Sequence, residues 1–153
     1  MLRVVLVYPE IPPNTGNIAR TCAATQTELH LVEPLGFEIS DRYLKRAGLD
    51  YWPYVTLHTH PSWPDFQECQ MRQGGRCVSF STSGTHSYLE FQFQENDWLI
   101  FGSESSGLPR DILQTSAAVL RIPMPQPQVR SLNLSVSAAV GLFEARRQLT
   151  LKL

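Results

Sequence analysis

Two loops of the sequence combine glycine with polar side chains that could bind a ligand. The motif NTGNIAR (14–20) places Gly16 among amide and hydroxyl side chains and ends on Arg20. The motif GSESSGLP (102–109) holds Glu104 between two glycines. Glycine lets the backbone approach a ligand closely, and arginine offers a planar, permanently charged group that binds phosphate or stacks on a nucleobase. Both motifs are therefore candidate ligand-binding loops.

Both motifs also have a purely structural interpretation. Asn14 or Asn17 could cap a helix that carries Arg20, whose guanidinium would then be solvated or paired. The glycines and serines around Glu104 are typical turn residues between a strand and a helix. The residues by themselves leave these alternatives open.

A third loop has the sequence PMPQPQVRSLN (123–133) and leads into the last helix. Its prolines keep the backbone extended. Four polar side chains then stand at the head of a segment that is otherwise small and apolar: Ser131, Asn133, Ser135 and Ser137. A helix N-cap at Asn133 or Ser135 explains one or two of them but not four. We therefore expect part of this group to line a site.

Common nucleotide-binding and metal-binding motifs are missing or incomplete. The sequence contains no GxGxxG after its first apolar run and no GxxxxGK[ST], so a nucleotide-dependent oxidoreductase is disfavoured. His58 and His60 form an HxH pair that could begin a zinc site, but no third ligand stands at a recognisable spacing. The sequence therefore predicts no metal.

Composition indicates a globular protein of the cytoplasm. The 153 residues fit one domain, 1–153, and the 42% of apolar and 18% of charged residues suit a single core. No apolar run is long enough to span a membrane or to form a signal peptide. Cys22, Cys69 and Cys77 lack metal-binding spacing and are expected to be reduced core thiols.

The charge of the chain limits how it could bind nucleic acid. The formal net charge is -1, so no overall basic field attracts RNA. Arginine outnumbers lysine eleven to two, which favours local contacts with phosphates or bases, although genome composition produces the same bias. Any contact with RNA is therefore expected to be local.

Short apolar runs alternate with helical patterns along the whole chain. Such alternation implies right-handed crossovers and a mostly parallel sheet with helices on both faces, so the predicted fold class is α/β. Open parallel sheets bind ligands beyond the carboxyl ends of their strands, where the three loops above and a fourth, STSGTH (81–86), fall. The expected strands are 2–8, 29–32, 55–58, 77–81, 98–101 and 119–122. The expected helices are 17–25, 40–47, 62–72, 109–114 and a long terminal helix within 130–149.

Taken together, these motifs resemble those of a known class of enzymes. NTGNIAR near the start, FGSESSGLP in the second half, and IPM followed by RSLNLSVSAAVGLFEARRQL match the SPOUT class of methyltransferases in order and spacing. The segments EIPPNTGN and RAGLDYW resemble the minimal TrmL/YibK type, which methylates the 2′-hydroxyl of the tRNA wobble nucleotide. The resemblance covers nearly the whole chain.

The resemblance implies a fold, an assembly and a cofactor. The C-terminal segment is expected to pass through a loop and form a trefoil knot, the protein to be a homodimer, and S-adenosylmethionine to bind within the knot. The cofactor-binding residues carried over by position are Phe80, Gly102, Ile122, Met124 and Ser131.

The resemblance also implies a catalytic group of Arg20, Asn14, Glu104 and Asn133. A guanidinium is effectively always protonated, so Arg20 is expected to orient the ribose hydroxyl or a phosphate and to stabilise charge on oxygen. The implied substrate is the anticodon loop of tRNA, with cytidine or a modified uridine at the wobble position of leucine tRNAs. The alternatives are 2′-O-methylation at another RNA site and a non-catalytic RNA-binding module.

Contacts with RNA are expected to rest on a few arginines and aromatic rings, because unstacked bases of a loop stack on such planes. The residues selected on this basis are Arg46, Trp52, Arg130 and Arg146. The aromatic residues of DYWPY could equally cover an edge of the core.

Overall fold

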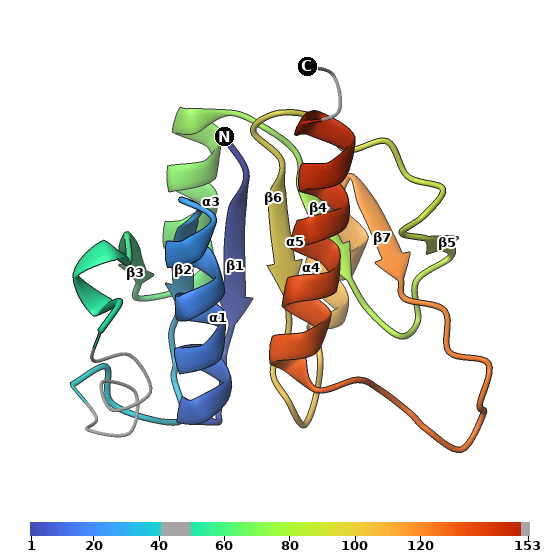
Figure 1. Ribbon diagram of the computed structural model, residues 1–153, viewed down its shortest axis with the longest axis horizontal. Coiled ribbons are helices and arrows are strands. Elements are labelled where there is room, and N and C mark those ends of the chain that lie inside the picture. The colour runs from blue at the N-terminus through green and yellow to red at the C-terminus, as the bar shows by residue number, and fades with distance from the viewer. Residues whose placement is uncertain (41–49, 151–153) are drawn as a thin grey trace.

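The computed structural model describes residues 1–40 and 50–150, which form a seven-stranded β-sheet (Figure 1). The order of the strands across the sheet is β3-β2-β1-β6-β4-β7-β5, and every pairing between them is parallel. The α/β fold class predicted from the sequence is confirmed. The strands are β1 (Arg3–Val7), β2 (Glu28–Val32), β3 (Leu57–His60), β4 (Cys77–Phe80), β5 (His86–Ser87), β6 (Trp98–Phe101) and β7 (Ala118–Arg121).

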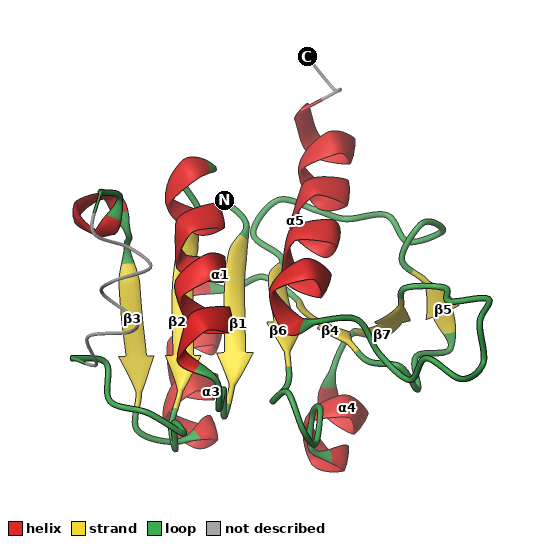
Figure 2. Cartoon of the chain, turned by 60° about the horizontal axis from the view of Figure 1, so that its bottom comes forward, coloured by secondary structure: helices red, strands yellow, loops and turns green. Residues whose placement is uncertain are grey.

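Helices cover both faces of this sheet (Figure 2). Helices α1 (Pro12–Ala24) and α5 (Leu134–Thr150) pack on one face, where they bury residues such as Ile18 and Leu142. Helices α3 (Trp63–Gln73) and α4 (Arg110–Thr115) bury Phe66 and Ile112 on the other. Because both faces are covered, the central strands are continuous apolar runs. Within residues 1–40 and 50–150, no helix is long and apolar enough to cross a membrane.

The start of α1 differs from the prediction. The helix begins at Pro12, five residues before the predicted start, because proline at the first helical position loses no intrahelical hydrogen bond. Its N-cap residue is Ile11, so neither Asn14 nor Asn17 caps it. Asn14 instead lies buried in the first turn, where its side chain is available for other contacts.

The remaining elements follow the predictions closely. Helix α3 begins one residue after its predicted start, because Ser62 is its N-cap and its hydroxyl accepts a hydrogen bond from the backbone of Asp65. β3 begins two residues late because the N–H of Val55 closes a 3-10 turn, η1 (Trp52–Tyr54). Neither η1 nor the short β5 was predicted. The helix predicted at 40–47 lies, apart from its first residue, outside the described residues.

Parallel pairing brings several loops to one edge of the sheet. The chain leaves the carboxyl ends of β1, β4, β6 and β7 through segments 8–11, 81–85, 102–109 and 122–133. These strands are neighbours in the sheet, so their following loops meet at the same edge. This edge is where a ligand site is expected in an open parallel sheet.

Helix α5 returns from β7 to lie beside α1 and across β6 (Figure 1). Small residues such as Ala138 and Gly141 let it approach the sheet closely, and Gly141 faces the rings of Phe80 and Phe101. Near its end, Gln148 accepts a hydrogen bond from the backbone of Phe93, in the segment between β5 and β6. The knot expected from the sequence requires such a return of the chain, and the knot itself stays a prediction.

Gly141→Ala tests this close packing. A Cβ at residue 141 would lie 2.8 Å from Cζ of Phe80, whose ring is held in a stack with Phe101. Alanine favours helix by about 1 kcal/mol over glycine, yet we expect net destabilisation of about 1–2 kcal/mol from overpacking. Urea unfolding measures the difference, and a gain in stability would show that the contact is loose.

Candidate active site

A cavity of about 580 Å³ opens at the carboxyl ends of β4, β6 and β7. Its walls come from the loops after β4, β6 and β7 together with the start of α1, where the NTGNIAR motif lies. All five residues predicted to bind the cofactor line it: Phe80, Gly102, Ile122, Met124 and Ser131. Three of the four predicted catalytic residues line it as well: Asn14, Glu104 and Asn133.

The carboxylate of Glu104 joins the loop after β6 to the start of α1. Its Oε1 accepts the backbone N–H of Glu10 at 2.9 Å, and its Oε2 accepts that of Ile11 at 2.8 Å. Oε2 also accepts the side-chain amide of Asn14 at 3.2 Å. A negative charge is favourable at a helix N-terminus, where backbone N–H groups lack intrahelical partners. Glu104 therefore holds α1 against the rim of the cavity.

A second hydrogen bond extends from Asn14 to the terminal helix. The amide of Asn133 donates to Oδ1 of Asn14 at 3.0 Å. Oδ1 of Asn133 accepts the backbone N–H of Ser135 at 2.8 Å, which makes Asn133 the N-cap of α5 as one prediction had it. The polar residues Glu104, Asn14 and Asn133 thus form one chain across the rim.

A reciprocal contact ties the same two loops together. The carboxylate of Glu10 accepts hydrogen bonds from the hydroxyl and backbone N–H of Ser105. These bonds hold the pKa of Glu10 below its usual value. The sequence analysis missed this pair, although Glu10 begins the segment EIPPNTGN and Ser105 directly follows Glu104.

Gly102 is required by the loop itself. A Cβ at this position would lie 2.1 Å from the carbonyl carbon of Gly107 and 2.3 Å from the nitrogen of Leu108. The loop folds back there, because Ser103 and Gly107 exchange backbone hydrogen bonds. Any side chain at Gly102 would therefore displace the segment that carries Glu104.

Apolar and polar surfaces divide the cavity. Phe80 stacks on Phe101 with ring centroids 4.7 Å apart, and both rings line the cavity. Ile122 and Met124 add aliphatic surface from the loop after β7. Ser81, Thr82 and Ser83 of the STSGTH loop after β4 add hydroxyl groups, although none of the three was assigned to the site individually. Such a volume and mixture suit a ligand with both apolar and polar parts.

Arg20 is not among the residues that line this cavity. It is exposed on α1, and its guanidinium carbon lies 5.6 Å from the ring centroid of Tyr51. The hydroxyl of Tyr51 donates to the carbonyl of Gly16 at 3.1 Å, and burial raises the pKa of this phenol. The structure therefore places Arg20 apart from its three predicted companions.

The residues predicted to contact RNA lie in different settings. Arg130 is exposed, whereas Trp52 is half-buried and packs against the core. Arg146 donates to the carbonyl of Thr25 at the end of α1, a contact that joins α5 to α1. Arg46 lies outside the described residues.

The parallel sheet, the terminal helix packed across it, and the cavity between them are the arrangement of an α/β enzyme of the SPOUT class. A model of the SpoU rRNA Methylase family matches residues 1–143. The chain therefore belongs to the SpoU rRNA Methylase family.

Curated relatives match the chain over nearly its full length. A protein of Synechocystis sp. is 60% identical over 97% of this chain and 97% of its own. A protein of Saccharophagus degradans, named tRNA (cytidine(34)-2'-O)-methyltransferase, is 50% identical over 97% of this chain and 96% of its own.

Solved structures share the fold. One, described as giving insights into the 2-OH methylation of C/U34 on tRNA, has a TM-score of 0.94 and 53% identity, covering 98% of this chain and 97% of its own. An AdoMet-bound rRNA methyltransferase from Sinorhizobium meliloti has a TM-score of 0.88 and 27% identity, covering 97% of this chain and 56% of its own.

Glu104→Gln tests how the rim of the cavity is held. Both carboxylate oxygens of Glu104 accept hydrogen bonds from N–H groups. Glutamine replaces one of these oxygens with an NH2 group, which cannot accept, so at least one hydrogen bond is lost. We expect a loss of about 1–3 kcal/mol of unfolding free energy and weaker ligand binding in the cavity. Urea unfolding and calorimetry measure the two effects. Glu10→Gln is the matched control, with a smaller effect because its carboxylate is exposed; equal effects would contradict the role given to Glu104.

Proposed function

We propose that this chain is an S-adenosylmethionine-dependent methyltransferase that modifies the ribose 2′-hydroxyl of nucleotide 34 of tRNA. One observation carries the proposal: residues of the sequence motifs line the cavity. The chain that holds this cavity matches, over 97% of its length, relatives named for this reaction. We also propose that the protein acts in the cytoplasm, where it would meet tRNA.

Methylation at another RNA site is the second candidate, since the family as a whole is named for rRNA. The rRNA methyltransferase described above, however, is only 27% identical, and this chain covers only 56% of its length. The relatives named as tRNA enzymes match at higher identity and over more than 90% of both chains. We therefore favour tRNA.

The cavity suits S-adenosylmethionine. This cofactor would supply a methyl group on a positively charged sulfonium. Phe80, Ile122 and Met124 offer apolar surface for its adenosine, while the backbone at Gly102 and the hydroxyl of Ser131 offer polar contacts. Glu104, Asn14 and Asn133 would hold these loops in place, since their hydrogen bonds are made to one another and to backbone.

Arg20 would act on the acceptor ribose. Its permanently charged guanidinium would orient the 2′-hydroxyl or a neighbouring phosphate and stabilise negative charge that develops on the oxygen. Arg20 does not line the cavity of its own chain. We therefore propose that the Arg20 of one protomer serves the cavity of its partner in a homodimer.

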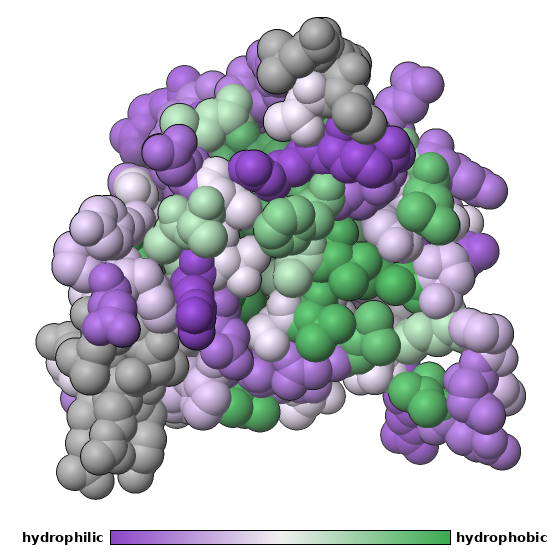
Figure 3. All heavy atoms as spheres, in the orientation of Figure 1, coloured by the Kyte–Doolittle hydropathy of each residue, from purple (hydrophilic) through white to green (hydrophobic). Residues whose placement is uncertain are grey.

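Apolar side chains on the face of α1 and α5 support such a dimer. Phe143 is 52% exposed and Val136 is 48% exposed, both on the outer side of α5, and Leu132 and Ile11 are exposed nearby. Figure 3 shows apolar side chains interrupting the polar surface on this side of the molecule. Grouped apolar exposure is typical of a protein interface.

Mixing two inactive variants tests the shared site. Arg20→Ala should lose about 10²- to 10³-fold in rate while keeping cofactor affinity. Ile122→Trp should fill the cavity and abolish cofactor binding, as calorimetry can check. If Arg20 acts across the interface, unfolding and refolding the two variants together restores activity, because one cavity of a mixed dimer is complete. If Arg20 acts within its own chain, the mixture stays inactive.

A tRNA with a single 2′-deoxynucleotide at position 34 tests the substrate. The reaction needs the hydroxyl at that ribose, so we expect no methylation of this tRNA and normal methylation of its all-ribose counterpart. Nucleoside mass spectrometry detects the product. A methyl group on the deoxy substrate would place the reaction at another site, while cofactor binding measured by calorimetry would be unaffected.

A further inference from the structure

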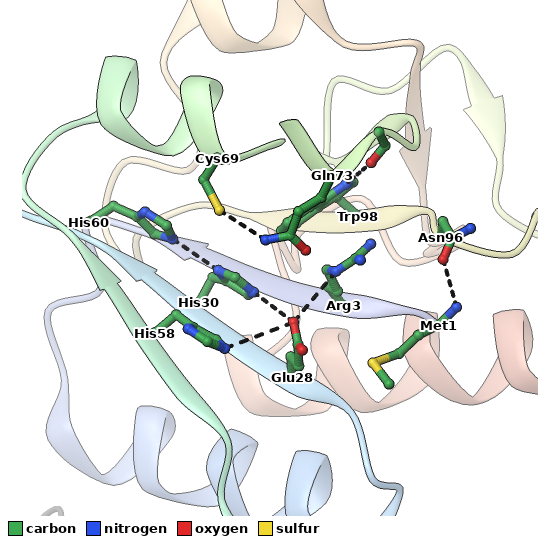
Figure 4. Close-up of polar contacts among 11 residues, drawn as sticks. Met1, Arg3, Glu28, His30, His58, His60, Cys69, Gln73, Asn96 and Trp98 are labelled. Atoms are coloured by element: carbon green, nitrogen blue, oxygen red, sulfur yellow. Dashed lines mark hydrogen bonds and ion pairs between the residues drawn. The ribbon is translucent and has the colours of Figure 1, made fainter. Parts of the chain in front are cut away.

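Three histidines and a cysteine gather at the other side of the sheet, away from the cavity (Figure 4). His30 of β2 is fully buried, and His58 and His60 of β3 lie on the same face of the sheet. Cys69 reaches this group from α3, which covers that face. None of these four residues lines the cavity, so the reaction proposed above does not use them.

The closest pair is formed by the two buried histidines. Nδ1 of His30 lies 2.9 Å from Nε2 of His60. Among the residues that the structure describes, these two nitrogens and Sγ of Cys69 form a group whose atoms all lie within 4.8 Å of one another. Two imidazole nitrogens and a thiolate are ligands that zinc prefers.

Glu28 orients the central histidine. Oε2 of Glu28 lies 3.2 Å from Nε2 of His30. A carboxylate only accepts hydrogen bonds, so Nε2 of His30 carries the proton and Nδ1 presents its lone pair toward His60. A carboxylate that accepts from the far nitrogen of a histidine is the usual second partner of a zinc-binding imidazole.

We propose that His30, His60 and Cys69 bind one zinc ion through Nδ1, Nε2 and Sγ, with water as the fourth ligand. Tetrahedral zinc with nitrogen ligands at about 2.0–2.1 Å requires the two nitrogens to be about 3.3 Å apart. The rings need to separate by only about 0.4 Å from their present 2.9 Å. Zinc requires His60 in the tautomer that is unprotonated at Nε2.

The surroundings of Cys69 fit a thiolate ligand. The side-chain amide of Gln73 donates a hydrogen bond to Sγ at 3.2 Å, which would stabilise negative charge on sulfur. Cys69 is half-buried, so solvent can supply both the ion and the fourth ligand. Zinc binds the unprotonated nitrogen of a neutral imidazole, and Nδ1 of His30 offers one when Nε2 donates to Glu28.

A second group, Glu28 with His30 and His58, is less suited to a cation. The guanidinium of Arg3 lies beside it, with Nε 3.5 Å from Oε2 of Glu28. The guanidinium of Arg3 is buried above the ring of Trp98, and its positive charge would repel a metal ion. Oε2 of Glu28 is therefore already paired, and Cys69 is the better third ligand.

Zinc at this place would join three elements. It would tie the edge strand β3 and the helix α3 to β2, which is inside the sheet. An edge strand has a sheet neighbour on one side only, so a bond through a metal would add to its four-residue pairing with β2. The site would therefore stabilise the fold and leave the cavity unchanged.

Metal binding by the full chain without a polyhistidine tag tests the proposal. Calorimetry with zinc sulfate should give one site per chain, and cobalt(II) should produce a thiolate-to-cobalt charge-transfer band. Cys69→Ser should abolish this band and weaken zinc binding by at least tenfold. Glu28→Gln should weaken zinc binding by about 10- to 100-fold while leaving the cobalt band in place.

Two matched controls separate this ligand set from its neighbours. Cys77→Ser removes another half-buried thiol and should leave zinc affinity unchanged, as should His58→Ala. Circular dichroism checks that each variant is folded. Absence of zinc binding by the unaltered chain, full affinity in Cys69→Ser, or loss of affinity in His58→Ala would each overturn the proposal. Cofactor affinity measured with and without zinc should be the same.

Discussion

The carboxylate of Glu104 holds together segments that lie more than ninety residues apart in the chain. It accepts two backbone N–H groups before α1 and the side chain of Asn14 within it. Asn14 in turn holds Asn133, the cap of α5. Because one charged group satisfies donors that a helix start leaves unpaired, it sets where α1, the loop after β6 and α5 meet. The rim of the cavity depends on this meeting point.

Close packing supplies the other wall of the cavity. Helix α5 lies close against the sheet where Gly141 has no side chain to push against Phe80. Phe80 is both part of this packing and part of the cavity wall. The same residue therefore couples the stability of the terminal helix to the shape of the ligand site. Gly102 has a comparable double role, since the loop that carries Glu104 folds back over it.

Two regions of the sheet suit different chemistry. The strand-end loops after β4, β6 and β7 surround a cavity with apolar and hydroxyl surfaces, as a small organic cofactor requires. The face of β2 and β3 under α3 carries imidazoles and a thiol, which suit a metal ion. Arg20 belongs to neither group within one chain, and this separation is the reason for proposing that two chains share a site.

Much of this protein was predictable from its sequence. Alternating apolar runs and helical patterns indicated a parallel α/β sheet, and the strand limits fell within two residues of those observed. Four polar loops indicated the cavity, because parallel strands bring the loops at their carboxyl ends to one edge. Local backbone effects account for the errors, such as the start of α1 at Pro12 instead of Asn17.

Only the tertiary structure decided which side chains meet. The pairing of Asn14 with Asn133 spans 119 residues and has no local signature in the sequence. The HxH motif seemed to lack a third ligand because spacing along the chain shows neighbours within one segment only. Sheet pairing places His30 opposite His58, and the packing of α3 brings Cys69 to the same group. Contacts of this kind depend on strand order and helix packing, which bring together residues that no fixed spacing in the sequence connects.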